Sequence, residues 1–262
     1  MDLGLQGARV LVTAASQGLG AATAQQFSIE GATVVINSRN AEKLQLTARE
    51  IESQTGNRVY SIAADITDPE AARQLIEQTV EKIGGLDVLV VNAGGPPAGN
   101  FTDFDLAAWQ QATELLLFSA VSLIQAAIPH LKQSPRAAIL TITSISARQP
   151  IANLTLSNTL RPSVIGLTKS LSLELAKDQI RVNSILPGTT DTERVLELNQ
   201  ARANRNGTSI EEEYSKAAQT IPLGRIGQPS EFANAAVFLC SPAAAFITGV
   251  ALPVDGGAIR SH

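Results

Sequence analysis

The sequence has few of the residues on which several common kinds of functional site depend. Cys240 is the only cysteine among 262 residues, so the chain can form neither an internal disulfide nor a cysteine metal cluster. The only histidines are His130 and His262, and no Ser/His/Asp triad or metal site can be assembled around them. His130 falls where a helix is expected to end, a position at which histidine interacts favourably with the helix dipole. We therefore expect no metal ion in this protein.

The charges and the apolar segments exclude further classes of protein. Lys and Arg number 20 against 24 Asp and Glu, and this net charge of -4 leaves no basic surplus for nucleic acid or an anionic membrane. The apolar stretches 85–95 and 137–143 are far shorter than the roughly 20 residues that a membrane span needs. Residues 1–16 contain no basic segment followed by an apolar one, so no secretion signal is expected. We expect a cytoplasmic protein without a nucleic-acid or membrane partner.

What the sequence does contain is an alternating pattern. Short β-branched runs alternate with longer amphipathic segments, which is typical of a parallel sheet with helices on both faces. One such helix is expected to begin at Pro69, after the capping residue Asp68, and to stop at Gly84. No linker or repeat divides the chain, so we expect one α/β domain (1–262), a doubly wound, Rossmann-type parallel sheet of about seven strands. The expected strands are 9–13, 33–37, 59–63, 87–92, 137–143, 180–185 and 250–253.

Residues 192–222 depart from this alternation. They are polar and helix-prone, with Gly207 in the middle. The segment is expected to form a lid over a site at the strand ends or, alternatively, a plain surface excursion.

The first expected strand leads into a glycine-containing turn and then a helix. The turn reads Thr13-Ala-Ala-Ser-Gln-Gly-Leu-Gly20. Glycines let the backbone approach a pyrophosphate, whose charge is held by free N–H groups at the helix N-terminus. Because the turn follows the first strand inside a βαβ unit, this interpretation is favoured over a plain strand-to-helix turn.

From this turn onward the sequence resembles the short-chain dehydrogenase/reductase family over nearly the whole chain, nearest to the 3-oxoacyl-carrier-protein reductases. The segments 221–231 and 246–257 resemble the C-terminal signatures of the family. The family's turn is Thr-Gly-x-x-x-Gly-x-Gly, and Ala14 replaces its first glycine, which costs little at negative φ and more at positive φ. The turn, the strand ends and the resemblance together give the expected cofactor-binding residues: Thr13, Ser16, Gln17, Gly18, Leu19, Gly20, Ser38, Arg39, Asp65, Ile66, Asn92, Ala93, Gly94, Pro187, Gly188, Thr190 and Thr192.

The end of the second strand predicts which cofactor binds. Members that bind NAD have an acidic residue there, which accepts from the ribose 2′-hydroxyl and would repel a 2′-phosphate. This chain has Ser38 and Arg39 instead, and a guanidinium and a hydroxyl can both donate to a phosphate. We therefore predict NADP(H).

The resemblance implies a catalytic serine, tyrosine, lysine and asparagine, but three of the four are replaced. Ser144 stands at the serine position, whereas Ser157, Arg161 and Leu116 stand at the tyrosine, lysine and asparagine positions. We take Ser144, Ser157 and Arg161 as the candidate catalytic residues. Pro162 follows at once, so the helix is expected either to kink there or to begin later than in the family.

Three functions remain open on this pattern. The first is an NADP(H)-dependent oxidoreductase acting on a small carbonyl or alcohol substrate, with weakened catalysis or another proton donor such as Tyr214. The second is a non-redox enzyme in which Ser144, Ser157 and Arg161 bind an oxyanion. The third is a non-catalytic, cofactor-binding sensor or supporting subunit.

A homo-oligomer, most simply a tetramer, is also expected. The apolar helix around 164–173 and the strand around 249–254 resemble the two-fold interfaces of the family. The alternative is that both segments belong to the core of the monomer.

Overall fold

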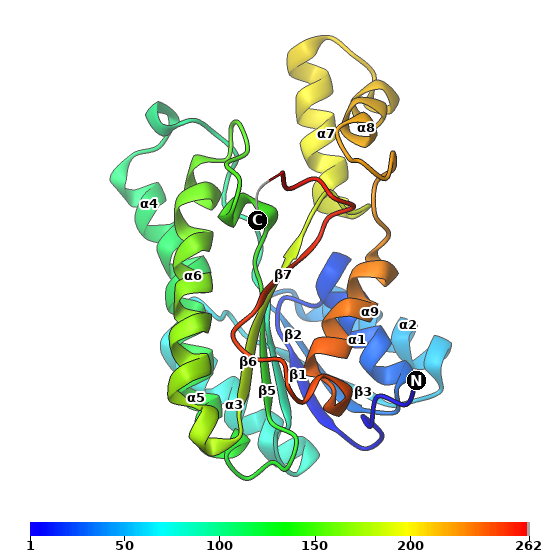
Figure 1. The fold of residues 1–262 in the computed structure, drawn as a ribbon, viewed down its shortest axis with the longest axis vertical. Coiled ribbons are helices and arrows are strands. Elements are labelled where there is room, and N and C mark those ends of the chain that lie inside the picture. The colour runs from blue at the N-terminus through cyan, green and yellow to red at the C-terminus, as the bar shows by residue number, and fades with distance from the viewer. Residues whose placement is uncertain (261–262) are drawn as a thin grey trace.

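Short apolar segments pair side by side in one parallel sheet in the computed structural model, which describes residues 1–260 (Figure 1). The sheet has seven strands in the order β3-β2-β1-β4-β5-β6-β7, so the strand order reverses between β1 and β4. The expected doubly wound α/β fold is confirmed, and the expected strand ends are shifted by at most two residues. His262 lies outside the described residues. The strands are β1 (Arg9–Val12), β2 (Thr33–Ser38), β3 (Val59–Ala63), β4 (Val88–Val91), β5 (Ala138–Ile142), β6 (Arg181–Pro187) and β7 (Ala251–Val254).

Helices cover both faces of the sheet, because alternate strand residues point to opposite sides. Val10 and Val12 pack in a core with α1, α2 and α9, whereas Leu11 packs in a second core with α3 and α5. Burial on both faces explains why the strands read as nearly continuous apolar runs. The helices are α1 (Gly18–Ile29), α2 (Ala41–Thr55), α3 (Pro69–Ile83), α4 (Leu106–Thr113), α5 (Ser119–Leu131), α6 (Thr155–Glu174), α7 (Glu193–Asn206), α8 (Ile210–Gln219) and α9 (Pro229–Cys240). A π-helical segment (Glu114–Phe118) joins α4 to α5, and short 3-10 helices cover Phe101–Asp103, Ile145–Ala147, Ala176–Asp178 and Pro242–Ala244.

The ends of α3 follow the capping residues that predicted them. Asp68 accepts a hydrogen bond from the N–H of Glu70 at 2.9 Å, and Pro69 occupies the first helical position. Gly84 ends the helix with φ +78°, a conformation that glycine adopts without strain. His130 likewise lies in the last turn of α5, as expected.

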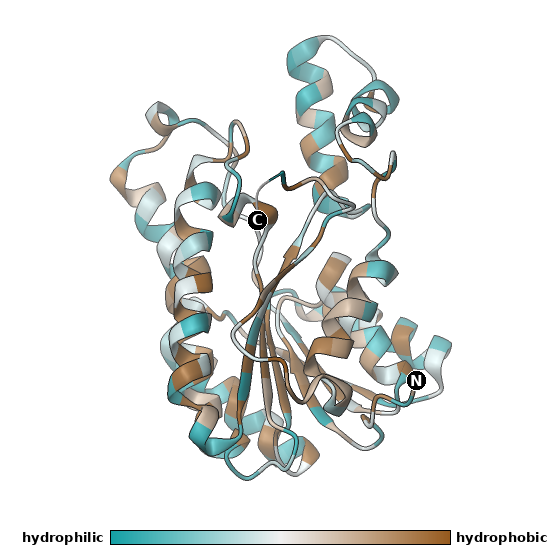
Figure 2. Cartoon of the chain, in the orientation of Figure 1, coloured by the Kyte–Doolittle hydropathy of each residue, from teal (hydrophilic) through white to brown (hydrophobic). Residues whose placement is uncertain are grey.

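Among residues 1–260, one helical stretch is long and apolar enough to cross a membrane, Leu106–Leu131. This stretch was not predicted from the sequence as an apolar segment, because polar residues such as Glu114 interrupt its apolar run. Core helices meet the same criterion, and Leu123 and Ile124 of this stretch are buried in the core shared with α3 and the sheet. Figure 2 shows hydrophobic residues concentrated along the strands and on the inner sides of the helices.

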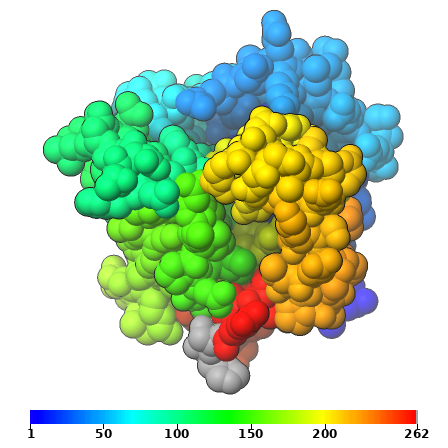
Figure 3. Space-filling model, turned by 90° about the horizontal axis from the view of Figure 1, so that it is seen from above, coloured from blue at the N-terminus to red at the C-terminus, as the bar shows by residue number. Residues whose placement is uncertain are grey.

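Residues 192–222 form a helical excursion above the carboxyl ends of the strands, a position open to either a lid or a surface excursion (Figure 1). Gly207, with φ +66°, ends α7 and permits the turn into α8. Viewed from above, a hollow separates α7, in yellow, from the green part of the chain (Figure 3).

The helix that carries Ser157 and Arg161 begins before Pro162 and continues through it, so the expectation of a later start is wrong. Pro162 removes the N–H that would bond to the carbonyl of Asn158. Nevertheless, the first turn is held from outside the helix. The side chain of Asn158 accepts from the N–H of Ile151 at 3.0 Å and donates to its carbonyl at 2.9 Å. Both replaced catalytic positions therefore lie on ordered helix.

Candidate active site

Two cavities at the carboxyl ends of the strands join into one groove. The first, here the Ser144 cavity, has a volume of ≈ 420 Å³ and lies among β5, α6 and the start of α7. The second, here the Arg39 cavity, measures ≈ 460 Å³ and lies beside the ends of β2 and β3. Both are bordered by the glycine turn after β1 and by the loop after β4, so they adjoin there. The four residues that border both are Ala14, Gln17, Gly94 and Gly95.

The glycine turn is fastened to the end of β4 by hydrogen bonds. The hydroxyl of Thr13 donates to the carbonyl of Asn92 at 2.7 Å and accepts from its N–H at 2.9 Å. The Asn92 side chain donates to the carbonyl of Ala14 at 3.1 Å. A Cβ on Gly20 would lie 2.5 Å from that carbonyl, so only glycine permits this approach of helix and turn. The two loops that border the groove therefore form one rigid edge.

Ala14 adopts the backbone conformation in which the family's glycine has an advantage. Its φ is +46°, in the left-handed region. An L-residue there costs roughly 1–2 kcal/mol relative to the right-handed region. The hydrogen bond from Asn92 to the Ala14 carbonyl helps to hold the turn despite this strain.

The Arg39 cavity has a cation at its border. The guanidinium of Arg39 is exposed, and its Nη1 lies 3.8 Å from Oδ2 of Asp65. Asp65 is fixed by the N–H and hydroxyl of Thr67, at 3.0 and 2.8 Å. Burial acts to raise the pKa of Asp65, but these hydrogen bonds and the charge of Arg39 outweigh it and lower that pKa. Asp65 thus stays ionised beside Arg39, although a pair this long and this exposed restrains the guanidinium only weakly.

Most of the site residues predicted from the sequence border the groove. Thr13 and Gly20 do not border either cavity, because they act from behind, by fastening the turn and by allowing its close approach. The expected residues on the Ser144 cavity are Gln17, Gly18, Leu19, Asn92, Ala93, Gly94, Ser144, Ser157, Arg161, Pro187, Gly188, Thr190 and Thr192. Those on the Arg39 cavity are Ser16, Gln17, Ser38, Arg39, Asp65, Ile66 and Gly94.

The three candidate catalytic residues are brought together on the Ser144 cavity. Nε of Arg161 donates to Oγ of Ser157 at 3.0 Å, and Nη1 donates to the carbonyl of Thr143 at 2.7 Å. Oγ of Ser157 also lies 3.2 Å from Oγ of Ser146. Oγ of Ser144 accepts from the N–H of Ser146 at 3.1 Å, which leaves its own proton free to be donated. Ser144 is therefore the available hydroxyl donor, and Ser157 is engaged by its neighbours.

Arg161 is a half-buried cation beside the Ser144 cavity. Burial, together with the positive charge of Arg194, lowers the pKa of Arg161 to about 10, so the guanidinium remains charged at neutral pH. No carboxylate of residues 1–260 lies within ion-pair distance of it. The positive charge beside Ser157 thus lacks a partner of opposite sign.

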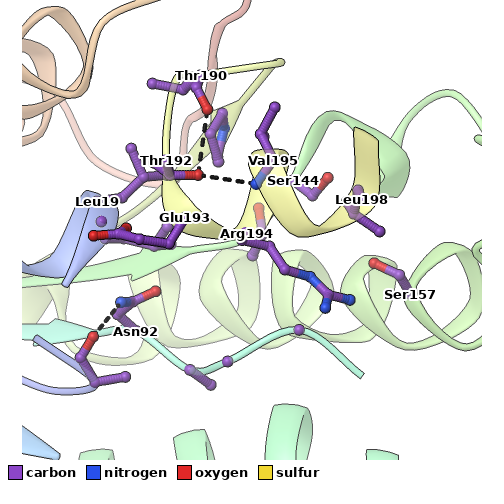
Figure 4. Close-up of a pocket in the computed structure, with 18 of the residues that line it drawn as sticks. Leu19, Asn92, Ser144, Ser157, Thr190, Thr192, Glu193, Arg194, Val195 and Leu198 are labelled. Atoms are coloured by element: carbon purple, nitrogen blue, oxygen red, sulfur yellow. Dashed lines mark hydrogen bonds between the residues drawn. The ribbon is translucent and has the colours of Figure 1, made fainter. Parts of the chain in front are cut away.

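The start of α7 contributes site residues that were not predicted from the sequence. Glu193, Arg194, Glu197 and Leu198 border the Ser144 cavity, and Figure 4 shows Arg194 extending toward Ser157. Thr192 caps this helix, accepting from the N–H of Val195 at 3.4 Å. A helix that begins at a predicted site residue directs first-turn side chains at the site. That was the signal available in the sequence.

The two tyrosines lie away from the Ser144 cavity. Tyr214, on α8, borders a different pocket and donates from its hydroxyl to Asp191 at 3.3 Å. Burial and the charge of Asp191 raise its pKa, which makes it a weaker acid. Tyr60 packs against the cations of Arg58 and Lys82 beside β3. The structure therefore does not support Tyr214 as a substitute proton donor.

The fold and the groove define a Rossmann-type α/β protein with its site at the point where the strand order reverses. The family profile described as enoyl-(acyl carrier protein) reductase matches residues 13–258. The 7alpha-hydroxysteroid dehydrogenase of Escherichia coli (strain K12) is 33% identical over 259 residues, which cover 99% of this chain and 97% of the relative. The chain belongs to the short-chain dehydrogenase/reductase family.

Solved structures agree with this assignment. The L-sorbose reductase of Gluconobacter frateurii, complexed with NADPH and L-sorbose, superposes with a TM-score of 0.95 at 32% identity, covering 100% of both chains. An NADPH-bound short chain oxidoreductase from Pseudomonas aeruginosa PAO1, described as containing an atypical catalytic center, has a TM-score of 0.89 at 29% identity. It covers 98% of this chain and 100% of its own.

Proposed function

We propose that the protein is an NADP(H)-dependent oxidoreductase that interconverts a small carbonyl compound and its alcohol, with weakened catalysis. The observation that carries this proposal is the pair of adjoining cavities that reach from Arg39, at the end of β2, to Ser144, at the end of β5. A dinucleotide is an elongated ligand, and this groove has a phosphate-binding cation at one end and a hydroxyl donor at the other.

The residues present fit NADP(H). A Cβ on Gly94 would meet nothing within 4 Å, and Gly94 borders both cavities, so the groove is open where a cofactor would cross it. Arg39 and Ser38 would hold the 2′-phosphate, and the N–H groups at the start of α1 would face the pyrophosphate. The NADPH complexes of the L-sorbose and Pseudomonas aeruginosa enzymes support the same cofactor here.

Bound in this groove, the cofactor supplies or accepts the hydride. The hydroxyl of Ser144 donates a hydrogen bond to the substrate oxygen, and Arg161 contributes positive charge as that oxygen becomes negative. Arg161 does not release a proton at neutral pH, so the proton that completes the alcohol comes from water by way of Ser144.

The missing tyrosine makes the reaction slower without abolishing it. A positioned general acid contributes about 10²–10⁴-fold, or roughly 3–5 kcal/mol. Positioning the substrate against the cofactor can contribute about 7–11 kcal/mol. The larger contribution survives in this site.

A second candidate function is a non-catalytic cofactor-binding subunit or sensor. It is favoured by the occupied hydroxyl of Ser157 and by the lining of the Ser144 cavity, which includes no tyrosine, histidine, lysine or cysteine from the described part of the chain. A non-redox enzyme using Ser144, Ser157 and Arg161 as an oxyanion site is a third candidate; the cavity beside Arg39, which fits the 2′-phosphate end of a dinucleotide, argues against it.

Turnover separates the first two functions. NADPH consumption is followed with ketones, 3-oxoacyl thioesters and ketoses, with a Ser144→Ala variant as the control. The proposal expects a slow, substrate-dependent rate that Ser144→Ala lowers further. Tight NADPH binding with no rate above background on the whole panel would favour the non-catalytic function.

We also propose that residues 1–262 form one domain, that the protein is a cytoplasmic homotetramer, and that β7 and the outer face of α6 supply its interfaces. In support, the residues of edge strand β7 are only partly buried and Leu173 on α6 is 70% exposed. Val164, by contrast, is 5% exposed and belongs to the monomer core.

A further inference from the structure

We propose that the Ser144 cavity selects substrates that carry a carboxylate beside the reacting carbonyl, and that Arg194 and Arg161 bind this carboxylate. The inference rests on the proposed function, whose substrate it narrows to small oxo acids and hydroxy acids. It arises from two guanidinium groups that border one cavity, that of Arg161 on α6 and that of Arg194 on α7.

Arg161 has an unused donor in this cavity. Its Nε and Nη1 bond to Ser157 and to the carbonyls of Ile142 and Thr143, whereas its Nη2 donates to no group of residues 1–260. A cation removed from water is costly unless an opposite charge accompanies it. An anionic ligand that reached Nη2 from the cavity would supply that charge.

Arg194 brings a second cation to the cavity. Its Nη2 donates to the carbonyl of Pro96 at 3.1 Å, and its side chain extends toward Ser157 (Figure 4). Its only ion pair among the described residues is with Glu197, at 3.4 Å, and both side chains are largely exposed. Such a pair contributes little, so a ligand carboxylate can replace Glu197 at small cost.

The two guanidiniums repel each other when the cavity holds no anion. Burial and, after it, the charge of Arg194 lower the pKa of Arg161, and no carboxylate of residues 1–260 lies within ion-pair distance of Arg161. An anion between the two groups removes this repulsion and gains charge-assisted hydrogen bonds from both. A carboxylate matches the planar fork of each guanidinium.

The anion belongs to the substrate rather than to the cofactor. The cofactor's phosphates would lie at the glycine turn and at Arg39, whereas Arg161 adjoins Ser144, where the reacting oxygen would bind. Leu154 and Leu198 also border the cavity, and the nicotinamide must share its volume, so the remainder of the substrate is short and apolar.

The test compares acids with neutral analogues of similar shape. Acetoacetate and 2-oxobutanoate are titrated against their methyl esters, by calorimetry, on the NADPH-loaded protein and on the apoprotein. The variants are Arg194→Gln and, as a matched control on the same helix, Arg205→Gln. Arg205 is exposed and does not border the cavity.

We expect at least one acid to bind at least tenfold more tightly than its ester, and Arg194→Gln to remove this preference while Arg205→Gln keeps it. Equal binding of every acid and its ester, or an acid preference that survives in Arg194→Gln, overturns the inference. Titration of the apoprotein tests the carboxylate site independently of cofactor binding. If NADPH does not bind, the proposed function fails, yet acid binding that depends on Arg194 still supports the carboxylate site. Absence of acid binding to both the apoprotein and the NADPH-loaded protein overturns the inference.

Discussion

Arg161 donates a hydrogen bond to Ser157 at 3.0 Å, so the residues at the family's lysine and tyrosine positions are bonded to each other. They are four residues apart on α6, which places them on one face of the helix. Nη1 of Arg161 is also bonded to the carbonyl of Thr143. The guanidinium is therefore held in place, and restoring the tyrosine alone would leave it where the lysine should act.

Rebuilding the family's catalytic set should require several changes together. Ser157→Tyr alone should raise NADPH oxidation little, because Arg161 supplies a charge of different shape and reach from a lysine. Adding Arg161→Lys and Leu116→Asn should raise the rate of NADPH oxidation further, by about 10²-fold or more. Pro162→Ala should raise the rate again by restoring the bond to the Asn158 carbonyl. Steady-state rates measure this, and a parent rate already at roughly 1–10³ per second would contradict the account of weakened catalysis.

Ala14→Gly should stabilise the protein. Glycine removes the left-handed strain at φ +46° but adds entropy to the unfolded chain, so the net gain should be about 0.5–1 kcal/mol. This corresponds to a rise in Tm of about 1–4 °C for a chain of this size. Ala15→Gly is the control, because Ala15 is buried without a positive φ and should lose stability. A lower Tm for Ala14→Gly would show that the turn is not strained.

Asp87 should support stability in a pH-dependent way, independently of the site. It accepts from Nη2 of Arg9 at 2.7 Å and from the hydroxyl of Ser134 at 2.6 Å. Burial acts to raise the pKa of Asp87, but these hydrogen bonds and the charge of Arg9 lower it below its usual value.

The contribution of Asp87 is therefore present above about pH 4, the usual pKa of aspartate, and is lost as the pH falls through the lower folded-state value. Asp87→Asn should cost about 2–3 kcal/mol at pH 7, as urea unfolding measures. The difference from the parent should shrink below about pH 4. A constant difference across this range would rule out the assigned cause.

The oligomeric state tests the role of the exposed apolar residues. Light scattering at micromolar concentration should give the mass of a tetramer. Leu173→Lys should reduce that mass, because it puts a charge where an apolar contact is expected. Lys177→Leu is not expected to do so. A monomeric mass for the parent would leave β7 and α6 as outer surfaces of a monomer.

The sheet could be predicted because its strands are buried on both faces and are separated by recognisable caps, as at Asp68 and Gly84. Most of the groove could be predicted because turn residues such as Gly18 and Asn92 occur at fixed places after strands. The positive φ of Ala14 could not be predicted, since it depends on the hydrogen bonds that the turn makes with Asn92.

The position of Arg194 in the first turn after Thr192 indicated the site, but the direction of its side chain could not be predicted. Its side chain is directed by the carbonyl of Pro96, a contact between segments 98 residues apart. The bond between Ser157 and Arg161, by contrast, was open to inference from their helical spacing. The distinction is between local geometry, which the sequence carries, and packing between segments, which it does not.

Cofactor binding to the parent and to Arg39→Ala tests the central claim most directly. Fluorescence titration should show that NADPH binds at least about tenfold more tightly than NADH, because Arg39 donates to the 2′-phosphate. Arg39→Ala should remove most of this preference, while Arg49→Ala, an exposed arginine on α2 outside both cavities, should keep it. Equal affinities for the two cofactors in the parent, or a preference unchanged in Arg39→Ala, would contradict the assignment of NADP(H) to this groove.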